Sequence, residues 1–537
     1  MHIMAVVPIV INTGVAVLPA VVAALAGVAA ILFQPRALIP LLRRQWRACS
    51  VVLGGLILIT IVAISWGRSG SAVRRAGRND PLQTSRIDWA KVAEDIIAQE
   101  RARTVSGHQA EPAVDSEAAP RGTGLAAQGT SPTGGQDFSR VLYRGGPSPA
   151  GLNPLWSYKP EGTLFFGVPA IVGKRIYAAG CQADLGAYTG LLACLDFDTG
   201  KPLWQKTENG NEPLRPFFSS PTVTPDGKYV IIGQGLHQDR DCSLLCFDAA
   251  TGQQVWAVKT PLHVESSPAI FGDMAVAGAG AIEGDDGKAV GDPGFVLAVH
   301  IPDGKVLWKQ PVNDPESSPA IDENGWVFIG SGCNGQAVVA IRSEPDEELQ
   351  KKKVDRIAWR AAAGQPMLAP VTLAGNVVIA AGGNGDMVHS SRSPQGLVMA
   401  LDRPTGRILW QTSLDDAVLG AVACQDGMLI CPVRNGDVVA LALGDGHIVW
   451  RARVSGNAPV LAGCAVTQDR AYAVSSDGYL AALAARDGKA LEKVYLNDQG
   501  QPGTGLSLSS PQVIGNRIIV GSETGGLRCL QGEGGGQ

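Results

Sequence analysis

The sequence has little net charge of either sign. Its 45 lysine and arginine residues are almost balanced by 49 aspartate and glutamate residues, which leaves a formal net charge of −4 at pH 7. Proteins that bind nucleic acid usually concentrate positive charge on one surface, because the phosphate backbone dominates their affinity. The sequence therefore gives no basis for a nucleic-acid partner, and we predict none.

Recognisable catalytic motifs are also scarce. The 537 residues contain seven histidines, and no Ser/His/Asp or Cys/His arrangement stands out. The glycines of "GAGAIEG" (278–284) are not followed by a helical pattern, which a dinucleotide-binding loop would require. We therefore predict no catalytic residues.

Glycine, by contrast, is abundant, with 67 residues, and helical periodicity is almost absent after residue 140. One phrase keeps returning, in which a Thr-Gly or Asp-Gly turn is followed by an apolar run with a tryptophan. The turn and the run together predict a β-hairpin. The phrase is seen as "TGKPLWQK" from Thr199, "TGQQVWAV" from Thr251, "DGKVLWKQ" from Asp303, "TGRILWQT" from Thr405 and "DGHIVWRA" from Asp445.

This phrase belongs to a unit of about 40–52 residues that contains four strand-like pieces. A period in this range indicates a propeller or a solenoid. The last unit lacks a fourth strand, whereas a spare strand, "LNPLWSYK" (152–159), precedes the first unit. The first strands of the eight units are predicted to begin near 168, 219, 266, 317, 368, 419, 457 and 509.

We therefore predict an all-β fold for residues 140–532, followed by a Gly-rich tail at 533–537. The fold is an eight-bladed β-propeller of four-stranded antiparallel blades, closed by the N-terminal strand in the last blade, which limits exposed sheet edges. Each tryptophan is interpreted as a wedge between adjacent blades, and Glu492 at this position predicts a looser contact for the seventh blade. The wedge residues are Trp156, Trp204, Trp256, Trp308, Trp359, Trp410 and Trp450.

The first 66 residues have a different character. Two apolar runs, at about 7–33 and 48–66, are each long enough to cross a membrane as a helix. The basic loop between them predicts that both chain ends lie outside the cytoplasm, although further arginines after the second run leave the orientation open. A cleaved signal peptide is the alternative, which we disfavour because the runs are long and doubled and lack a charged lead.

Residues 67–139 read as a flexible linker, since Gly, Ser, Ala, Pro and Thr dominate. Within it, 85–103 has apolar residues at helical spacing and predicts a short helix. The predicted location is thus the cytoplasmic (inner) membrane, with the propeller held on the linker and facing the periplasm or exterior.

The repeated phrase resembles the tryptophan-docking repeat of PQQ-binding-like β-propellers. Its clearest copies are "CLDFDTGKPLWQ" (194–205) and "ALDRPTGRILWQ" (400–411), and the resemblance covers about residues 140–532. This family includes the quinoprotein alcohol dehydrogenases and the outer-membrane assembly lipoprotein BamB. The resemblance implies the propeller fold, whereas chemistry has to be argued from the residues.

Two departures separate this chain from the quinoprotein branch that the resemblance also suggests. The sequence has no adjacent cysteine pair and no haem-attachment Cys-x-x-Cys-His motif, and the propeller is closer in size to the non-catalytic, BamB-like members. It also lacks a lipobox, so the anchor is predicted to be transmembrane. We expect a scaffold that binds another envelope protein or polymer and needs no cofactor. The alternative is a PQQ-dependent dehydrogenase that oxidises an alcohol or sugar with PQQ and calcium.

In propellers of this family, the loops between second and third strands share one face with the connections between blades. Here these loops are long and polar, so function is expected on that face. Their side chains suggest either a polar or metal site, or simply a solvated surface, and we favour the solvated surface because "EGDDGKAVGD" (283–292) lacks EF-hand spacing. The candidates are His237, Asp239, Glu283, Asp285, Asp286 and His389.

Two further candidates come from the repeat itself. "VESSPAI" and "PESSPAI" place Glu265 and Glu316 at equivalent points before neighbouring first strands. If both face the central channel, the two carboxylates could bind a cation or exchange a proton. The interpretation that we favour is local, with each glutamate accepting hydrogen bonds from the backbone of the Ser-Ser pair beside it. Cysteine pairing also stays open, with Cys181–Cys194 and Cys242–Cys246 as the pairs that export would allow.

Overall fold

The computed structural model describes residues 148–184, 187–209, 212–283, 288–388, 390–501, 503 and 505–533. The predicted membrane spans, the linker with its 85–103 helix, and residues 534–537 of the tail lie outside these ranges. Within the described part of the chain, no helix is both long enough and apolar enough to span a bilayer.

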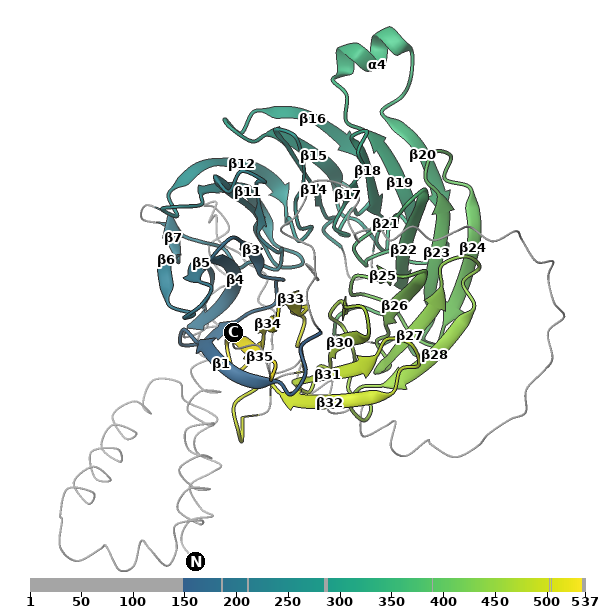
Figure 1. Ribbon diagram of the computed structural model, residues 1–537. Helices are drawn as coiled ribbons and strands as arrows, with labels where there is room; N and C mark the ends of the chain where they lie inside the picture. The colour runs from purple at the N-terminus through teal and green to yellow at the C-terminus, as the bar shows by residue number, and fades with distance from the viewer. Residues whose placement is uncertain are drawn as a thin grey trace, which may run out of the picture. The chain divides into compact units, whose positions relative to one another are not determined.

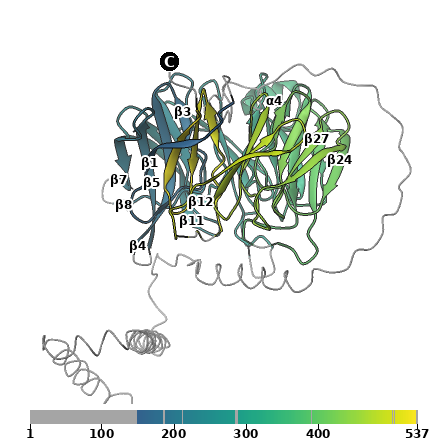
Figure 2. The same cartoon turned by 60° about the horizontal axis from the view of Figure 1, so that its bottom comes forward.

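Eight β-sheets stand around a common axis, as Figure 1 shows from one side and Figure 2 from another. The prediction of an eight-bladed all-β propeller with four-stranded antiparallel blades is confirmed. The first four blades are formed by β3 (Ala170–Val172), β4 (Arg175–Asp184), β5 (Ala187–Asp196) and β6 (Pro202–Lys206); β9 (Thr222–Val223), β10 (Tyr229–Gly233), β11 (Arg240–Asp248) and β12 (Gln254–Leu262); β13 (Ala269–Phe271), β14 (Met274–Ala279), β15 (Phe295–His300) and β16 (Val306–Pro311); and β17 (Ala320–Ile321), β18 (Trp326–Gly330), β19 (Ala337–Arg342) and β20 (Ile357–Ala362).

The next three blades follow the same order along the chain, and the eighth takes its outer strand from the beginning of the described residues. They are formed by β21 (Thr372–Ala374), β22 (Val377–Gly383), β23 (Gly396–Asp402) and β24 (Ile408–Leu414); β25 (Ala423–Gln425), β26 (Met428–Pro432), β27 (Asp437–Ala442) and β28 (Ile448–Arg453); β29 (Ala465–Val466), β30 (Arg470–Val474), β31 (Tyr479–Ala484) and β32 (Ala490–Tyr495); and β33 (Gln512–Ile514), β34 (Arg517–Gly521), β35 (Leu527–Gln531) and β1 (Asn153–Tyr158).

Four details depart from the regular plan. The first blade gains a fifth strand, β2 (Thr163–Leu164), which pairs with β4, and β7 (Glu208–Asn209) forms a small hairpin with β8 (Glu212–Pro213). The fourth blade carries a short helix, α4 (Asp346–Lys352), where other blades have a tight turn. The first strand of the seventh blade begins at Ala465 and not near 457. The segment "LAGC" (461–464) stands where the second, third, fourth and eighth blades have Ser-Ser-Pro, so this marker of the strand is missing here.

Burial explains the different sequence patterns of inner and outer strands. Every residue of β14 is buried, since this strand packs between neighbouring blades on both faces. The outermost strand β16 alternates, with Trp308 buried and Leu307 exposed. The middle strands are therefore continuous apolar runs, while the outer ones show the period of two expected when one side meets water.

Each of the seven predicted wedge tryptophans lies at the seam with the next blade and donates its indole N–H there. A turn glycine usually lies beneath the ring; a Cβ on Gly304, where φ is +71°, would lie 2.7 Å from Trp256 Cγ. Only glycine fits both this backbone conformation and the close ring. The indole acceptors are the carbonyl oxygens of Phe197 (3.2 Å from Trp156), Ala249 (3.1 Å from Trp204), Ile301 (2.6 Å from Trp256), Ser343 (3.1 Å from Trp308), Arg403 (2.9 Å from Trp359), Leu443 (2.9 Å from Trp410) and Ala485 (2.9 Å from Trp450).

The seventh blade replaces this packing with hydrogen bonds. The Glu492 carboxylate accepts the backbone N–H of Gly151 at 3.0 Å and also that of Leu152. Hydrogen bonds to an ionised acceptor are stronger than neutral ones, so the seam that we expected to be loose has a polar contact of its own.

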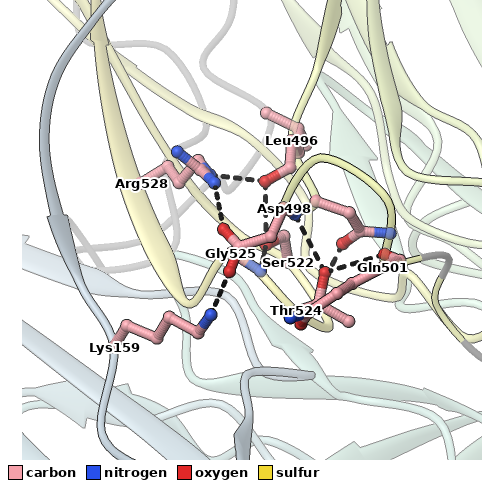
Figure 3. A network of polar contacts seen from close by, with 9 residues as sticks. Lys159, Leu496, Asp498, Gln501, Ser522, Thr524, Gly525 and Arg528 are labelled. Carbon is pink, nitrogen blue, oxygen red and sulfur yellow. Dashed lines mark hydrogen bonds and ion pairs between the residues drawn. The ribbon is translucent and has the colours of Figure 1, made fainter. Parts of the chain in front are cut away.

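Strands from the two ends of the described chain share the eighth sheet. β1 pairs antiparallel with β35, from Asn153 opposite Gln531 to Tyr158 opposite Leu527. A polar network beside this sheet is drawn in Figure 3: Asp498 forms ion pairs with Lys159, just after β1, and with Arg528 of β35 at 3.0 Å. The junction therefore has backbone, apolar and ionic contacts.

The nine cysteines of the described ranges are all free thiols, so neither disulfide pairing is present. The register of β4 and β5 places Cys181 opposite Gly190 and not opposite Cys194. Cys242 and Cys246 lie on one strand, β11, four residues apart, about 13 Å, which is too far for a disulfide.

Candidate functional site

Two histidines and two glutamates meet where the second, third and fourth blades adjoin. We call this group the His–Glu cluster; it comprises His237, His263, Glu265 and Glu316. One potential ligand atom from each residue lies within 4.8 Å of those of the others. All four residues lie in loops between second and third strands or in connections between blades, the face on which function was expected.

The repeat determines how the cluster is assembled. His237 lies in the loop between β10 and β11, while His263 and Glu265 lie in the connection from β12 to β13. Glu316 occupies the equivalent connection one blade further, between β16 and β17. Backbone hydrogen bonds hold these segments together, with the Val264 N–H donating to Gln234 at 2.9 Å and the Gly280 N–H to His263 at 3.1 Å.

Glu316 is the centre of the cluster. Its Oε1 atom lies 3.2 Å from His237 Nδ1 and 3.0 Å from His263 Nε2. The two imidazole rings face each other edge to face, with centroids 5.2 Å apart. The His263 side chain is fully buried and Glu316 is 13% exposed, whereas His237 is 41% exposed and connects the cluster to solvent.

The adjacent serine pairs bond from blade to blade. The Ser267 N–H donates to Ser318 Oγ at 3.0 Å, and Ser266 Oγ donates to the Ser317 carbonyl at 2.9 Å. Glu316 therefore has histidine partners where the sequence favoured a local backbone contact. The repeated Ser-Ser phrase is explained by the seams between blades.

Glu265 has a different environment from Glu316. Within the described residues, no hydrogen-bond donor contacts its carboxylate, and burial raises its pKa despite the nearby histidines. Burial would also raise the pKa of Glu316, but hydrogen bonds from His237 and His263 outweigh it and lower that pKa to about 2. The Glu265 carboxylate is thus free to accept a proton or bind a cation, while the Glu316 carboxylate is held ionised.

The same carboxylates raise the pKa of both histidines. Burial alone would lower the pKa of His237, yet its contacts with Glu283 and Glu316 raise it above the ordinary value. The pKa of His263 is raised in the same way, against its burial, by Glu316 and Glu265. In the absence of another cation, the cluster therefore holds protons to balance its buried carboxylates.

Gly280 provides the space that the cluster occupies. A Cβ at this position would lie 2.5 Å from His263 Nε2 and 2.8 Å from Glu316 Oε1. Both distances are below normal contact, so an alanine would displace the polar groups themselves.

A second acidic group adjoins the first. Glu283, Asp314 and Cys333 have potential ligand atoms within 4.8 Å of one another, and Glu283 Oε2 lies 3.9 Å from His237 Nε2. Asp314 is 1% exposed, and burial together with the Glu316 charge raises its pKa to about 7. Asn334 links the two carboxylates, because its side chain donates to Glu283 Oε1 at 3.2 Å and its backbone N–H donates to Asp314 Oδ2 at 3.4 Å.

The structure brings together four of the eight predicted polar candidates, namely Glu265, Glu316, His237 and Glu283. Asp239 instead closes its own loop by accepting the Leu236 N–H at 2.9 Å. Asp285, Asp286 and His389 lie outside the described residues.

Sequence reasoning missed His263, Asp314 and Cys333. A signal for two of them was present, since His263 and Asp314 each lie two residues before the equivalent glutamates of "HVESSPAI" and "DPESSPAI". Aligning the repeats and comparing the residues two positions before each glutamate would have identified both.

Known proteins resemble the chain across the propeller. The sequence profile of the family described as "Outer membrane protein assembly factor BamB" matches residues 148–355 and 394–537. An outer membrane protein assembly factor BamB from Burkholderia pseudomallei (strain K96243) is 26% identical over 326 residues, which is 58% of this chain and 72% of the relative.

Solved structures agree on the fold. BamB from Moraxella catarrhalis superposes with a TM-score of 0.51 at 16% identity, covering 71% of this chain and 99% of that one. Quinohemoprotein alcohol dehydrogenase from Comamonas testosteroni gives a TM-score of 0.52 at 14% identity, covering 76% and 81%. Because one fold includes a dehydrogenase and an assembly factor, it does not by itself separate the two functions.

Proposed function

The chain belongs to the family of the outer membrane protein assembly factor BamB, and we propose that it acts as a membrane-anchored, protein-binding scaffold in assembly of the cell envelope. The observation that carries this proposal is the extent of the family match, which includes residues of every blade. The partner would be another envelope protein, such as an outer-membrane assembly component, or an envelope polymer.

The loop at 382–396 supports a preformed recognition surface. Arg434, which is 5% exposed, donates to the carbonyl oxygens of Asp386 and Val388, each at 2.8 Å. Within the loop, Gln395 N–H donates to Asn384 at 2.8 Å. The described parts of this loop that are held by such contacts lose less entropy on binding, which favours recognition of a partner.

Affinity capture from native membranes tests the scaffold. The full chain should return a reproducible envelope partner, and replacing 384–395 by a short turn should abolish that capture. The matched control shortens the α4 insertion to the tight turn found in other blades, because this segment joins third and fourth strands, away from the predicted binding loops. Equal capture by both variants, or no reproducible partner, would contradict the proposal.

The anchor rests on the sequence of the first 66 residues. We infer that the two apolar runs hold the chain in the cytoplasmic membrane, with the propeller on the outer side. The chain should then resist carbonate extraction, and external protease should reach the propeller in spheroplasts. A soluble product that begins downstream of residue 33 would support the signal-peptide alternative.

We propose that this scaffold needs neither PQQ nor calcium. Calcium prefers a shell of oxygen ligands, whereas the His–Glu cluster provides imidazole nitrogens together with carboxylates, so this donor set does not fit a calcium-bound quinone. Adding PQQ and calcium should produce neither quinone absorbance on the protein nor dye-linked oxidation of alcohols or sugars. Either signal would favour the dehydrogenase.

A further inference from the structure

We propose that the His–Glu cluster binds one divalent transition-metal ion, for which zinc is the best fit. The inference is independent of which partner the scaffold recognises. It rests on the donor set, the spacing of the ligand atoms, the unpartnered carboxylate of Glu265 and the surroundings of His237.

The donor set is the first argument. Two imidazole nitrogens and two carboxylate oxygens converge on one point from three separate segments of chain. Zinc is bound by these ligand types, usually with four ligands in tetrahedral geometry, whereas magnesium and calcium prefer oxygen alone.

The spacing is the second argument. Zinc–ligand distances of about 2.0–2.1 Å place neighbouring ligands of a tetrahedron about 3.4 Å apart. In the structure, Glu316 Oε1 lies 3.2 Å from His237 Nδ1 and 3.0 Å from His263 Nε2. Two of the six edges are therefore within a few tenths of an ångström of the required length, and small rotations of the side chains would admit the ion.

An unpartnered carboxylate is the third argument. Glu265 contributes one of the four converging ligand atoms, yet its carboxylate has no hydrogen-bond donor within the described ranges. Polar groups in such enclosed positions are normally paired, and a divalent ion would give this carboxylate the positive partner that it lacks.

The surroundings fit a metal ligand at His237. Its Nδ1 atom lies 3.2 Å from Glu316 Oε1, while its Nε2 atom lies outside the cluster, 3.2 Å from Gln238 Nε2 and 3.9 Å from the Glu283 carboxylate. Polar groups around the second nitrogen of a histidine ligand help to orient its ring. Because the 41% exposed side chain of His237 lies on a loop, this residue also provides the route by which the ion enters from solvent.

Four protein ligands would leave no coordination position for a substrate, so the site is structural. The ion would fasten the loop between β10 and β11 to the connections that enter the third and fourth blades. Its role is to hold the recognition face of these blades in one conformation.

Metal stoichiometry and thermal stability of the purified full chain test this site. After treatment with a chelator, the protein should take up one zinc ion per chain by elemental analysis, with a raised Tm, and cobalt should give the intense visible absorption of a four-coordinate centre. Calcium at the same concentration should leave the Tm unchanged. Affinity should fall as pH drops, because protons compete for the ligands.

Two variants and one control locate the ion. Glu265→Gln and His237→Ala should each weaken zinc binding at least tenfold and remove the cobalt spectrum, while far-UV circular dichroism verifies that both remain folded. His447→Ala is the control, since that histidine is exposed and pairs with Asp445 outside the cluster. Stoichiometry well below one in the native chain, or binding that both cluster variants retain, would overturn the proposal.

Discussion

Replacing Trp256 with alanine should test whether the indole wedges hold the ring together. Trp256 is 8% exposed, packs in the core between the second and third blades, and donates to the Ile301 carbonyl at 2.6 Å. Its ring covers Gly304 of the next blade. The substitution thus removes an aromatic contact and a hydrogen bond from the same seam.

The magnitude follows from these two losses. Truncating a buried tryptophan to alanine costs about 3–5 kcal/mol, and an unpaired carbonyl adds about 1 kcal/mol. For roughly 380 folded residues, the entropy of unfolding is on the order of 0.8 kcal/mol per kelvin. The variant should therefore melt about 5–8 °C below the native protein.

Differential scanning calorimetry of the full chain provides the measurement. Val255→Ala is the matched control, because Val255 is the preceding residue of β12 and is 42% exposed. This control should change the Tm by less than about 1 °C, as exposed substitutions usually do. If the two variants melted together, the tryptophans would not be the contacts that stabilise the seams.

Three further results are expected. Gly280→Ala should lower the free energy of unfolding by about 1–3 kcal/mol, because its Cβ would collide with the His–Glu cluster, whereas Gly444→Ala, which has nothing within 4 Å, should change urea denaturation little. Asp498→Ala should cost about 1–2 kcal/mol in urea at low salt and less at high salt, since it removes two ion pairs at partly exposed side chains; a salt-independent loss would argue against an ionic role. Burial raises the pKa of Asp314 to about 7, so the folded protein keeps a proton that the unfolded chain releases near pH 4, and stability should fall as pH rises between these values. Asp314→Asn should flatten that part of the pH profile, and an unchanged slope would assign it to other groups.

Much of the fold was predictable because the same four-stranded unit is repeated eight times. Each blade needs a tight turn and an outer strand with a wedge, so the turn glycine and the tryptophan recur at readable spacing. The prediction failed where a blade departs from this unit. In the seventh blade Glu492 replaces the tryptophan and forms hydrogen bonds where a looser contact was expected, and α4 replaces the turn of the fourth blade.

The candidate site was only partly predictable. Glu265 and Glu316 stood out because the repeat placed them in equivalent positions of adjacent units. The approach of His237 to Glu316 depends on how a loop in one blade folds over the connection to another, and no spacing in the sequence encodes that distance. Hydrogen bonds decide the rest, since burial acts to raise the pKa of both carboxylates and only Glu316 has histidine donors that lower it.

The pairing of β1 with β35 has a consequence for biosynthesis. Among the described strands β1 is synthesised first, but its partner β35 exists only after synthesis has reached Leu527–Gln531. The eighth blade therefore cannot form during translation or translocation, and a product that stops before Leu527 lacks the partner strand for Asn153–Tyr158. Synthesis of Leu527–Gln531 becomes the event that permits the final sheet to assemble, so that products truncated before this strand are left with an unpaired strand that quality-control proteases can recognise.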